Sequence, residues 1–276
     1  MQVREYSLAE GWYPKDPNKV AGFLSGFSKQ EGQARAAIAP HAGWAYSGRL
    51  AALALCNLER DAETLAVLGG HLPGESPALF AMEDALRTPF GAMPVDKELR
   101  SAIMEVLAEG SYGEDRFRDN TIEVLLPMLH FFFPNAKVLW LRLGADASSF
   151  AAGQTIEAAA KKLKRKINVL ASADLTHWGK NFGFTPLENS EKALQWVKDV
   201  NDKNFIRAVE RGEPSAVLKL GEANKASCSS GAVLGAMGFA QAAGLPKARL
   251  LEYATSADSA KQVPDTFVGY AAMVFG

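Results

Sequence analysis

A short stretch near residue 40 constrains the fold more than any other feature of this sequence. Residues 36–39 form an apolar run that stops at Pro40, which has no backbone N–H to donate to a sheet. His41 follows at once, and after a glycine turn Ser47 is placed to cap a helix with an apolar face over residues 50–54. The stretch therefore predicts a strand, a turn and a helix, with the histidine at the strand's carboxyl end.

Two later apolar runs end in the same manner. Residues 64–68 lead through two glycines to His71, and residues 167–172 lead to Asp174 and His177. Strands that alternate with helical segments predict an α/β fold, with a central, mostly parallel sheet flanked by helices on both faces. Ligands of such sheets bind outside the carboxyl ends of the strands. We therefore expect these side chains to share one edge of the sheet with the first histidine.

The remaining segments fit the same alternation, without a repeat or a linker, so a single domain over residues 1–276 is expected. Periodicity predicts helices over residues 20–27, 96–107, 122–129, 150–163, 190–209 and 232–243, and one more after Pro214. It predicts further strands over residues 78–82, 85–89, 137–143, 250–255 and 267–275.

Composition narrows the classes of function. The net charge is −1 and no basic stripe with interleaved aromatic residues occurs, so contact with nucleic acid is not expected. The apolar runs are too short for a membrane span, and the N-terminus lacks the layout of a signal peptide. The chain has two cysteines, so we expect a cytoplasmic protein whose thiols stay reduced.

Cys228 completes a set of residues that can bind a metal. It stands just before the predicted helix 232–243, where backbone N–H groups favour a thiolate. Thiolate, imidazole and carboxylate together suit iron(II), copper or zinc. Each residue also has a structural alternative: Cys228 as a small core residue, Asp174 as a turn cap, and His177 stacked with Trp178. His130, beside three phenylalanines, is expected to be structural.

The sequence resembles the Memo family, whose members are also described as AmmeMemoRadiSam system protein B. Residues 40–48, Pro-His-Ala-Gly-Trp-Ala-Tyr-Ser-Gly, resemble the family's main signature. Further matches appear in the family's order over nearly the whole chain, at residues 11–14, 122–127, 172–178, Cys228 and residues 253–256.

The resemblance implies a fold shared with the class III extradiol dioxygenases of the LigB type. It implies one metal ion bound by His41, His71 and Cys228, and a catalytic pair in Asp174 and His177. Those dioxygenases have a carboxylate where this family has cysteine, and the thiolate favours iron(II) or copper over zinc. The resemblance also suggests four residues as the lining of a substrate pocket: Tyr46, Asn120, Glu123 and Trp178.

The chain departs from the family pattern at two motifs. The usual Leu-Gly-Pro-(Asn or Ser)-His is one residue shorter here, at residues 68–71. The usual Glu-His-Ser-Ile-Glu becomes Asp-Asn-Thr-Ile-Glu at residues 119–123, so Asn120 replaces a pocket histidine. Because residues three apart share a helix face, Asn120 and Glu123 are expected to look into the same pocket.

Three functions remain open at this point. The first is a metal-dependent oxidoreductase or dioxygenase-like enzyme that acts on a small molecule, with Asp174 orienting His177 for proton transfer. The second is a metal-free enzyme with Cys228 as nucleophile, which requires His177 within hydrogen-bond reach of the thiol. The third is a non-catalytic protein that binds a peptide or a partner, and the resemblance suggests a radical-SAM protein and an AMMECR-domain protein as partners.

Overall fold

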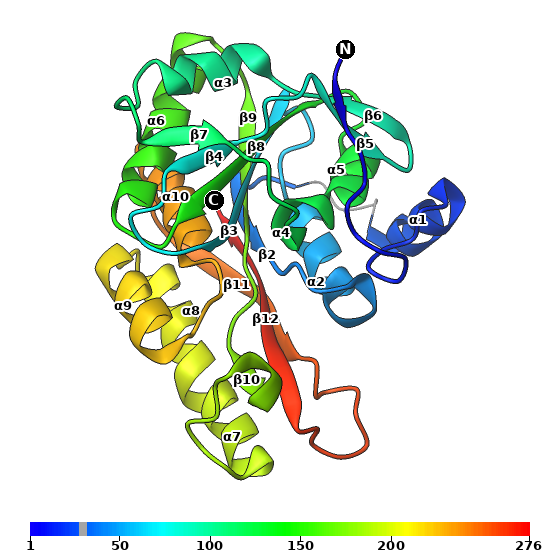
Figure 1. Ribbon diagram of the computed structural model, residues 1–276, viewed down its shortest axis with the longest axis vertical. Helices are drawn as coiled ribbons and strands as arrows, with labels where there is room; N and C mark the ends of the chain where they lie inside the picture. Colours follow the sequence, from blue (N-terminus) through cyan, green and yellow to red (C-terminus); the bar gives the residue numbers. More distant parts are fainter. Residues whose placement is uncertain (28–31) are drawn as a thin grey trace.

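The computed structural model of the chain describes residues 1–27 and 32–276, and a mixed sheet forms its centre (Figure 1). Four strands run parallel in the middle of this sheet, in the order β2 (Ala36–Ala39), β9 (Ile167–Ser172), β3 (Thr64–Leu72) and β8 (Lys137–Gly144). They are buried along almost their whole length, as expected of apolar strands covered on both faces.

Antiparallel strands extend the sheet on both sides. Beside β2 lies β12 (Thr266–Phe275), which is antiparallel to β2 and also pairs with β11 (Ala248–Thr255) and β10 (His177–Gly179). On the other side β4 (Ala78–Phe80) is antiparallel to β8 and parallel to β7 (Tyr112–Glu114). The α/β class is thus confirmed, and the parallel arrangement is limited to the centre of the sheet.

Helices cover both faces of the sheet, because alternate strand residues point to opposite sides. One face packs on α1 (Pro17–Leu24), α2 (Trp44–Cys56) and α5 (Leu126–Phe132). The other packs on α3 (Lys97–Met104), α6 (Ser148–Lys162), α8 (Asp202–Glu210), α9 (Pro214–Asn224) and α10 (Ser230–Ala242). Within β2, Ala37 and Ala39 belong to the first core, whereas Ala36 and Ile38 belong to the second.

Two regions stand apart from these layers in Figure 1. A small sheet near the N-terminus contains β1 (Val3–Arg4), β5 (Ala85–Thr88) and β6 (Gly91–Pro94). At the opposite end α7 (Ser190–Trp196), β10 and the connection between β11 and β12 extend away from the main body. The helix predicted over residues 190–209 begins with α7 and reaches α8 through a π-helical segment, Val197–Asn201.

Local structure corrects two expectations about helix ends. Gly43 occupies the N-cap position of α2, while Ser47 lies inside the first turn and donates to the Ala42 carbonyl at 3.2 Å. The helix predicted over residues 122–129 is divided into α4 (Asn120–Glu123) and α5. Pro127 explains the division, since it lacks the N–H needed to continue the helical hydrogen bonds.

Within the described residues, no helix is both long enough and apolar enough to span a bilayer.

Candidate metal centre and its cavity

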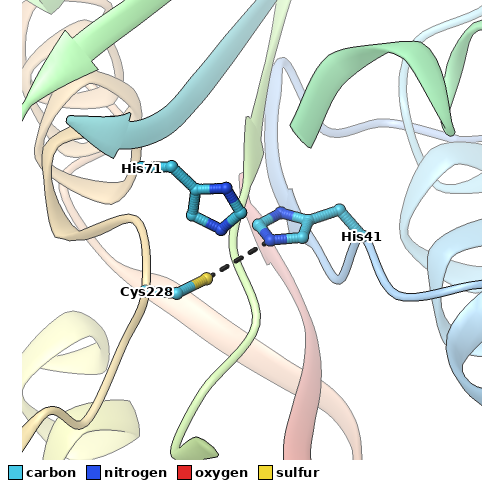
Figure 2. A group of neighbouring side chains, drawn as sticks. All are labelled: His41, His71 and Cys228. Carbon is cyan, nitrogen blue, oxygen red and sulfur yellow. Dashed lines mark hydrogen bonds between the residues drawn. The ribbon is translucent and has the colours of Figure 1, made fainter. Parts of the chain in front are cut away.

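Three side chains converge at the carboxyl edge of the parallel strands (Figure 2). One nitrogen each of His41 and His71 and the sulfur of Cys228 all lie within 4.8 Å of one another. The Cys228 Sγ is 3.3 Å from His41 Nε2, and the two imidazole rings meet edge to face with their centroids 5.0 Å apart. The convergence expected from the strand ends and the helix start is therefore present.

His41 is held in one tautomer by its surroundings. Its Nδ1 lies 2.9 Å from the Ser172 hydroxyl oxygen, and that hydroxyl donates its own proton to the Thr121 carbonyl. The serine oxygen therefore accepts from Nδ1–H, which leaves the lone pair of Nε2 directed toward Cys228. The ring is only 1% exposed, and its backbone N–H donates to Asp174 Oδ1 at 2.7 Å.

His71 reaches the same point through an irregular backbone. It has a φ of 57°, in the left-handed region that non-glycine residues seldom adopt, and the pairing of β3 with β8 shifts register between Gly69 and Leu72. A Cβ on the preceding Gly70 would come within 2.4 Å of Ser229, so only glycine fits there. The shortened Gly-Gly-His motif thus still delivers its histidine to the cluster.

Asp119 holds the His71 ring from the side opposite Cys228. The His71 Nδ1–H donates to Asp119 Oδ2 at 3.0 Å, and the guanidinium of the buried Arg142 lies 3.5 Å from the same oxygen. Arg142 also donates to the Gly70 carbonyl at 3.0 Å, so one side chain ties the aspartate to the bulged strand. As for His41, the other ring nitrogen of His71 is left to face Cys228.

These contacts favour a thiolate between two imidazoles. Burial alone would disfavour the charged thiol, but His41 and His71 lower the pKa of Cys228 well below its usual value. Burial likewise opposes protonation of the rings, yet the hydrogen bonds from His71 to Asp119 and Cys228 raise the pKa of His71 to about 10. Asp174 and Cys228 raise the pKa of buried His41 as well. A metal ion can take the place of these protons.

Asp174 lies between two histidines without bonding to either ring. Its Oδ2 is 3.9 Å from His41 Nε2 and 3.9 Å from His177 Nε2, which is too long for a hydrogen bond. The His177 Nδ1–H instead faces the Leu175 carbonyl at 3.1 Å. The expected orientation of His177 by Asp174 is therefore wrong in this geometry, because the ring is fixed by its own backbone and the carboxylate accepts from His41. Burial raises the pKa of Asp174.

A cavity of about 850 Å³ opens beside the cluster. His41, His71, Asp174 and His177 form its polar base, and Asn120 lies beside them. Its walls come from distant parts of the chain: residues 10–12 near the N-terminus, Tyr46 on α2, Phe182 after β10, and residues between 256 and 270 from β12 and its preceding connection.

Of the two motif residues expected in the pocket, only Asn120 is there. Its amide lines the cavity and donates to the His41 carbonyl at 3.1 Å. Glu123 points away and accepts hydrogen bonds from the backbone of Ser7 and Leu8 and from the Tyr13 hydroxyl. The expectation for Glu123 is thus corrected: the carboxylate anchors the N-terminal segment whose residues 10–12 form one cavity wall.

Of the other two residues expected in the pocket, Tyr46 and Trp178, only Tyr46 lines the cavity. Tyr46 lines the cavity and is 66% exposed, whereas Trp178 is buried and is not among the lining residues. The Trp178 ring stacks on Phe267 with centroids 4.9 Å apart, so it supports the wall from behind. His130 bonds to the Thr88 hydroxyl at 2.6 Å, away from the cavity, in agreement with a structural role.

Sequence reasoning missed the residues that orient the histidines. Asp119 caps α4 by accepting from the Thr121 N–H at 2.9 Å, and no local pattern links it to His71. A signal was available at Arg142, because an arginine inside an otherwise apolar strand must find a partner when it is buried. Ser172 lies within the family match at residues 172–178, but a serine at the end of a strand does not by itself indicate a histidine partner.

The fold and this cluster define an α/β protein with a candidate mononuclear metal centre at the carboxyl edge of its sheet. The model of the Memo-like protein family matches residues 4–274, and the chain belongs to this family. A MEMO1 family protein of Pyrococcus furiosus is 27% identical over 288 residues, covering 99% of this chain and 98% of its own. One from Thermococcus kodakarensis is 28% identical, with 99% of both chains covered.

A solved structure of an uncharacterized Escherichia coli K12 protein is also similar. It has a TM-score of 0.46 and 11% sequence identity, and it covers 88% of this chain and 100% of its own.

Proposed function

We propose that the protein binds one transition-metal ion through His41, His71 and Cys228 and uses it as an oxidoreductase acting on a small organic molecule in the adjoining cavity. One observation carries the proposal. Both histidines have their Nδ1–H groups engaged, by Ser172 and Asp119, so that two imidazole lone pairs and a thiolate are left facing one another.

The spacing of these atoms suits an ion. Tetrahedral coordination at about 2.0–2.3 Å places ligand atoms about 3.3–3.8 Å apart. The Cys228–His41 separation of 3.3 Å falls at the lower end of this range, and all three ligand atoms lie within 4.8 Å of one another. A thiolate with two imidazoles is a set that copper and iron(II) accept, and we favour these two metals over zinc because of the soft sulfur ligand.

The remaining residues of the base would handle the substrate's proton. A bound ion of this kind supplies Lewis-acid and one-electron chemistry. His177 presents Nε2 as a proton acceptor, because Nδ1–H is engaged by the Leu175 carbonyl. Asp174 lies 3.9 Å from that nitrogen, close enough for its carboxylate charge to stabilise a proton held there.

The same geometry argues against a metal-free cysteine enzyme. That mechanism requires a hydrogen bond between Cys228 and His177, and none is found among the described residues. The thiol instead faces His41 at 3.3 Å, and Cys228 is not among the residues that line the cavity. A nucleophile in this position would have the histidine cluster between itself and a substrate.

Elemental analysis of anaerobically purified protein tests the proposal. We expect about one iron or copper ion per chain, and a loss of at least 90% of it in His41→Ala, His71→Ala and Cys228→Ser. Cys56→Ser is the matched control, because Cys56 is buried in α2 and lies outside the cluster. Stoichiometric metal in any of the three ligand variants would contradict the assignment.

We also propose that a radical-SAM protein and an AMMECR-domain protein are partners, which rests on the family resemblance alone. Co-purification of the tagged chain with each candidate from an anaerobic extract would test this. Two exposed aromatic side chains at the cavity, Tyr46 and Phe182, offer the surface for a contact variant, Tyr46→Ser.

A further inference from the structure

The walls of the cavity contain no counter-charge for an anion. Among the described residues that line it, none is lysine or arginine. The groups able to carry positive charge are the histidines, and these are clustered at the base with the candidate metal centre. The one carboxylate away from that base, Glu10, adds negative charge to the N-terminal wall. The walls away from the histidines therefore hold one acidic side chain and no basic one.

Two lysines, Lys15 and Lys225, make their contacts outside the cavity. The ammonium of Lys15 lies 3.5 Å from the centroid of the Tyr13 ring and 3.8 Å from the carboxylate of Glu123, and it does not line the cavity. Lys225 bonds to the Gly183 carbonyl at 3.5 Å beside the Phe184 ring. Neither is placed to neutralise a carboxylate or phosphate inside the cavity.

A helix N-terminus is the other common binding site for anions, and α2 begins at the cavity. Two of its first N–H groups are already used within the protein, however. The Trp44 N–H donates to the Trp12 carbonyl at 2.8 Å, and the Tyr46 N–H donates to the Gly43 carbonyl at 2.8 Å. These two N–H groups are therefore not available to an anionic group in the cavity.

The walls do offer apolar and aromatic surface. Trp12, Tyr46, Phe182 and Phe267 line the cavity, and Tyr46 and Phe182 remain 66% and 42% exposed. The Phe182 ring meets the His177 ring edge to face at 4.9 Å, so the aromatic wall reaches down to the base. A volume of about 850 Å³ is within the range that holds a drug-sized compound and far exceeds the need of a diatomic gas.

We infer that the substrate of this site is an aromatic or otherwise apolar compound that is neutral or cationic away from the metal, and that anionic bodies such as carboxylates and phosphate esters are excluded. This rests on the proposed function, because it takes the base of the cavity as the reacting end. Glu10 and the aromatic walls then act as the specificity-determining groups, by repelling an anion and contacting a planar body.

Three benzohydroxamates that differ only at the para position test the inference: the 4-methyl, 4-aminomethyl and 4-carboxy compounds. Each carries the same metal-binding head and an aromatic body, with a neutral, cationic or anionic end. Their dissociation constants are measured by calorimetry on the zinc-loaded protein, since zinc avoids redox side reactions, and again on the metal-free protein. We expect the 4-carboxy compound to bind at least tenfold more weakly than the 4-methyl compound.

Two charge variants sharpen the test. Ser259 is an exposed residue of the wall, so Ser259→Lys supplies a cation there at little risk to folding, and Ser259→Gln is its neutral control. We expect the lysine variant alone to bring the 4-carboxy and 4-methyl compounds within threefold of each other. Glu10→Gln should remove any advantage of the 4-aminomethyl compound.

Binding of the three compounds and binding of the metal are measured separately, so the inference and the proposed function can fail independently. Equal binding of the anionic and neutral compounds by the unmodified protein, within twofold, would overturn the inference while leaving a metal centre intact. Failure of all three compounds to bind would overturn it too, because the cavity would then not accept an aromatic body. Absence of stoichiometric binding of zinc, iron(II) and copper alike would contradict the proposed function, and the charge series on the metal-free protein would still decide the inference.

Discussion

The two histidines of the candidate metal centre are held in opposite ways. His41 follows a regular buried strand, is 1% exposed, and bonds to Ser172 within the parallel centre of the sheet. The side chain of His71 is 32% exposed, and the residue lies on a bulged strand end in a left-handed conformation. The first position is fixed by packing of the core, and the second depends on a few polar contacts.

The difference shows how a sheet edge can combine rigidity with adaptability. The backbone at His41 cannot move without breaking the pairing of β2 with β9, so this ligand is preorganised. The backbone at His71 stores strain that the Asp119–Arg142 pair must offset. We therefore expect changes around His41 to affect mainly the stability of the fold, and changes around His71 to affect mainly the affinity for the metal.

Replacement of each histidine by alanine should give the largest effects. Both variants should lose the metal, but only His41→Ala should lower the free energy of unfolding of the metal-free protein substantially, by about 2–4 kcal/mol. It leaves a cavity in the buried edge and removes the partner of Ser172. His71→Ala should cost less than about 1 kcal/mol, because the side chain is partly exposed and its removal leaves no buried cavity, while alanine keeps the left-handed backbone.

Urea denaturation of the two metal-free variants, with metal content measured in parallel, makes this comparison. Similar losses of stability in both variants would show that the two halves of the site are equally important to the fold.

The His41 side of the site, which follows a regular strand, is also the side that the sequence predicts well. An apolar run that stops at Pro40 and is followed by His41 gives both the strand and the position of the ligand, because strand direction and burial follow from local pattern. The same reasoning finds β9 and the residues after it. The strands at the sheet margins, such as β7 and β10, are three residues long and have no periodicity to detect.

The His71 side depends on contacts between residues that are distant in sequence, and a local sequence pattern does not contain these contacts. The shortened motif at residues 68–71 indicates that the backbone before His71 differs from the family's usual one. It does not indicate that His71 adopts a left-handed conformation, which brings its ring to the other two ligands. Glu123 points away from the cavity because its carboxylate accepts hydrogen bonds from Ser7, Leu8 and Tyr13, which are distant in sequence and do not enter a helical pattern. The contact between Asp119 and His71 joins residues 48 apart.

Asp119→Asn should have the next largest effect. Loss of the carboxylate weakens the bond that orients the His71 ring, and we expect about 10–100-fold weaker metal binding with little change in folding. Asp119→Glu should recover part of the affinity, since it keeps the charge. Cobalt(II) titration followed by its visible absorption reports both the affinity and the ligand geometry. An unchanged affinity would show that His71 is positioned by its backbone alone.

A smaller effect is expected at Asn120, which lines the cavity beside the histidines. Asn120→His adds an imidazole where the family usually has one, and we expect roughly three- to tenfold tighter binding of the metal or of a probe ligand. The variant also loses the hydrogen bond from the Asn120 amide to the His41 carbonyl. This loss should lower the stability of the protein only slightly, because the contact is partly exposed. Asn120→Gln serves as the control for side-chain size, and equal affinities in the two variants would contradict a role for the added imidazole.

The smallest effect on metal content is expected at Asp174, although it is the most buried carboxylate of the cavity base. Asp174→Asn keeps an oxygen that can accept from the His41 N–H, the bond that now measures 2.7 Å. The nearest ring nitrogen is 3.9 Å from its other oxygen, so no metal ligand is lost. We expect metal content within twofold of the unmodified protein and a reduced oxygen-dependent turnover, because His177 loses the group that can share its proton. Asp174→Ala, which removes the acceptor altogether, should instead lower the melting temperature. Loss of stoichiometric metal in Asp174→Asn would identify Asp174 as a ligand and Cys228 as a packing residue.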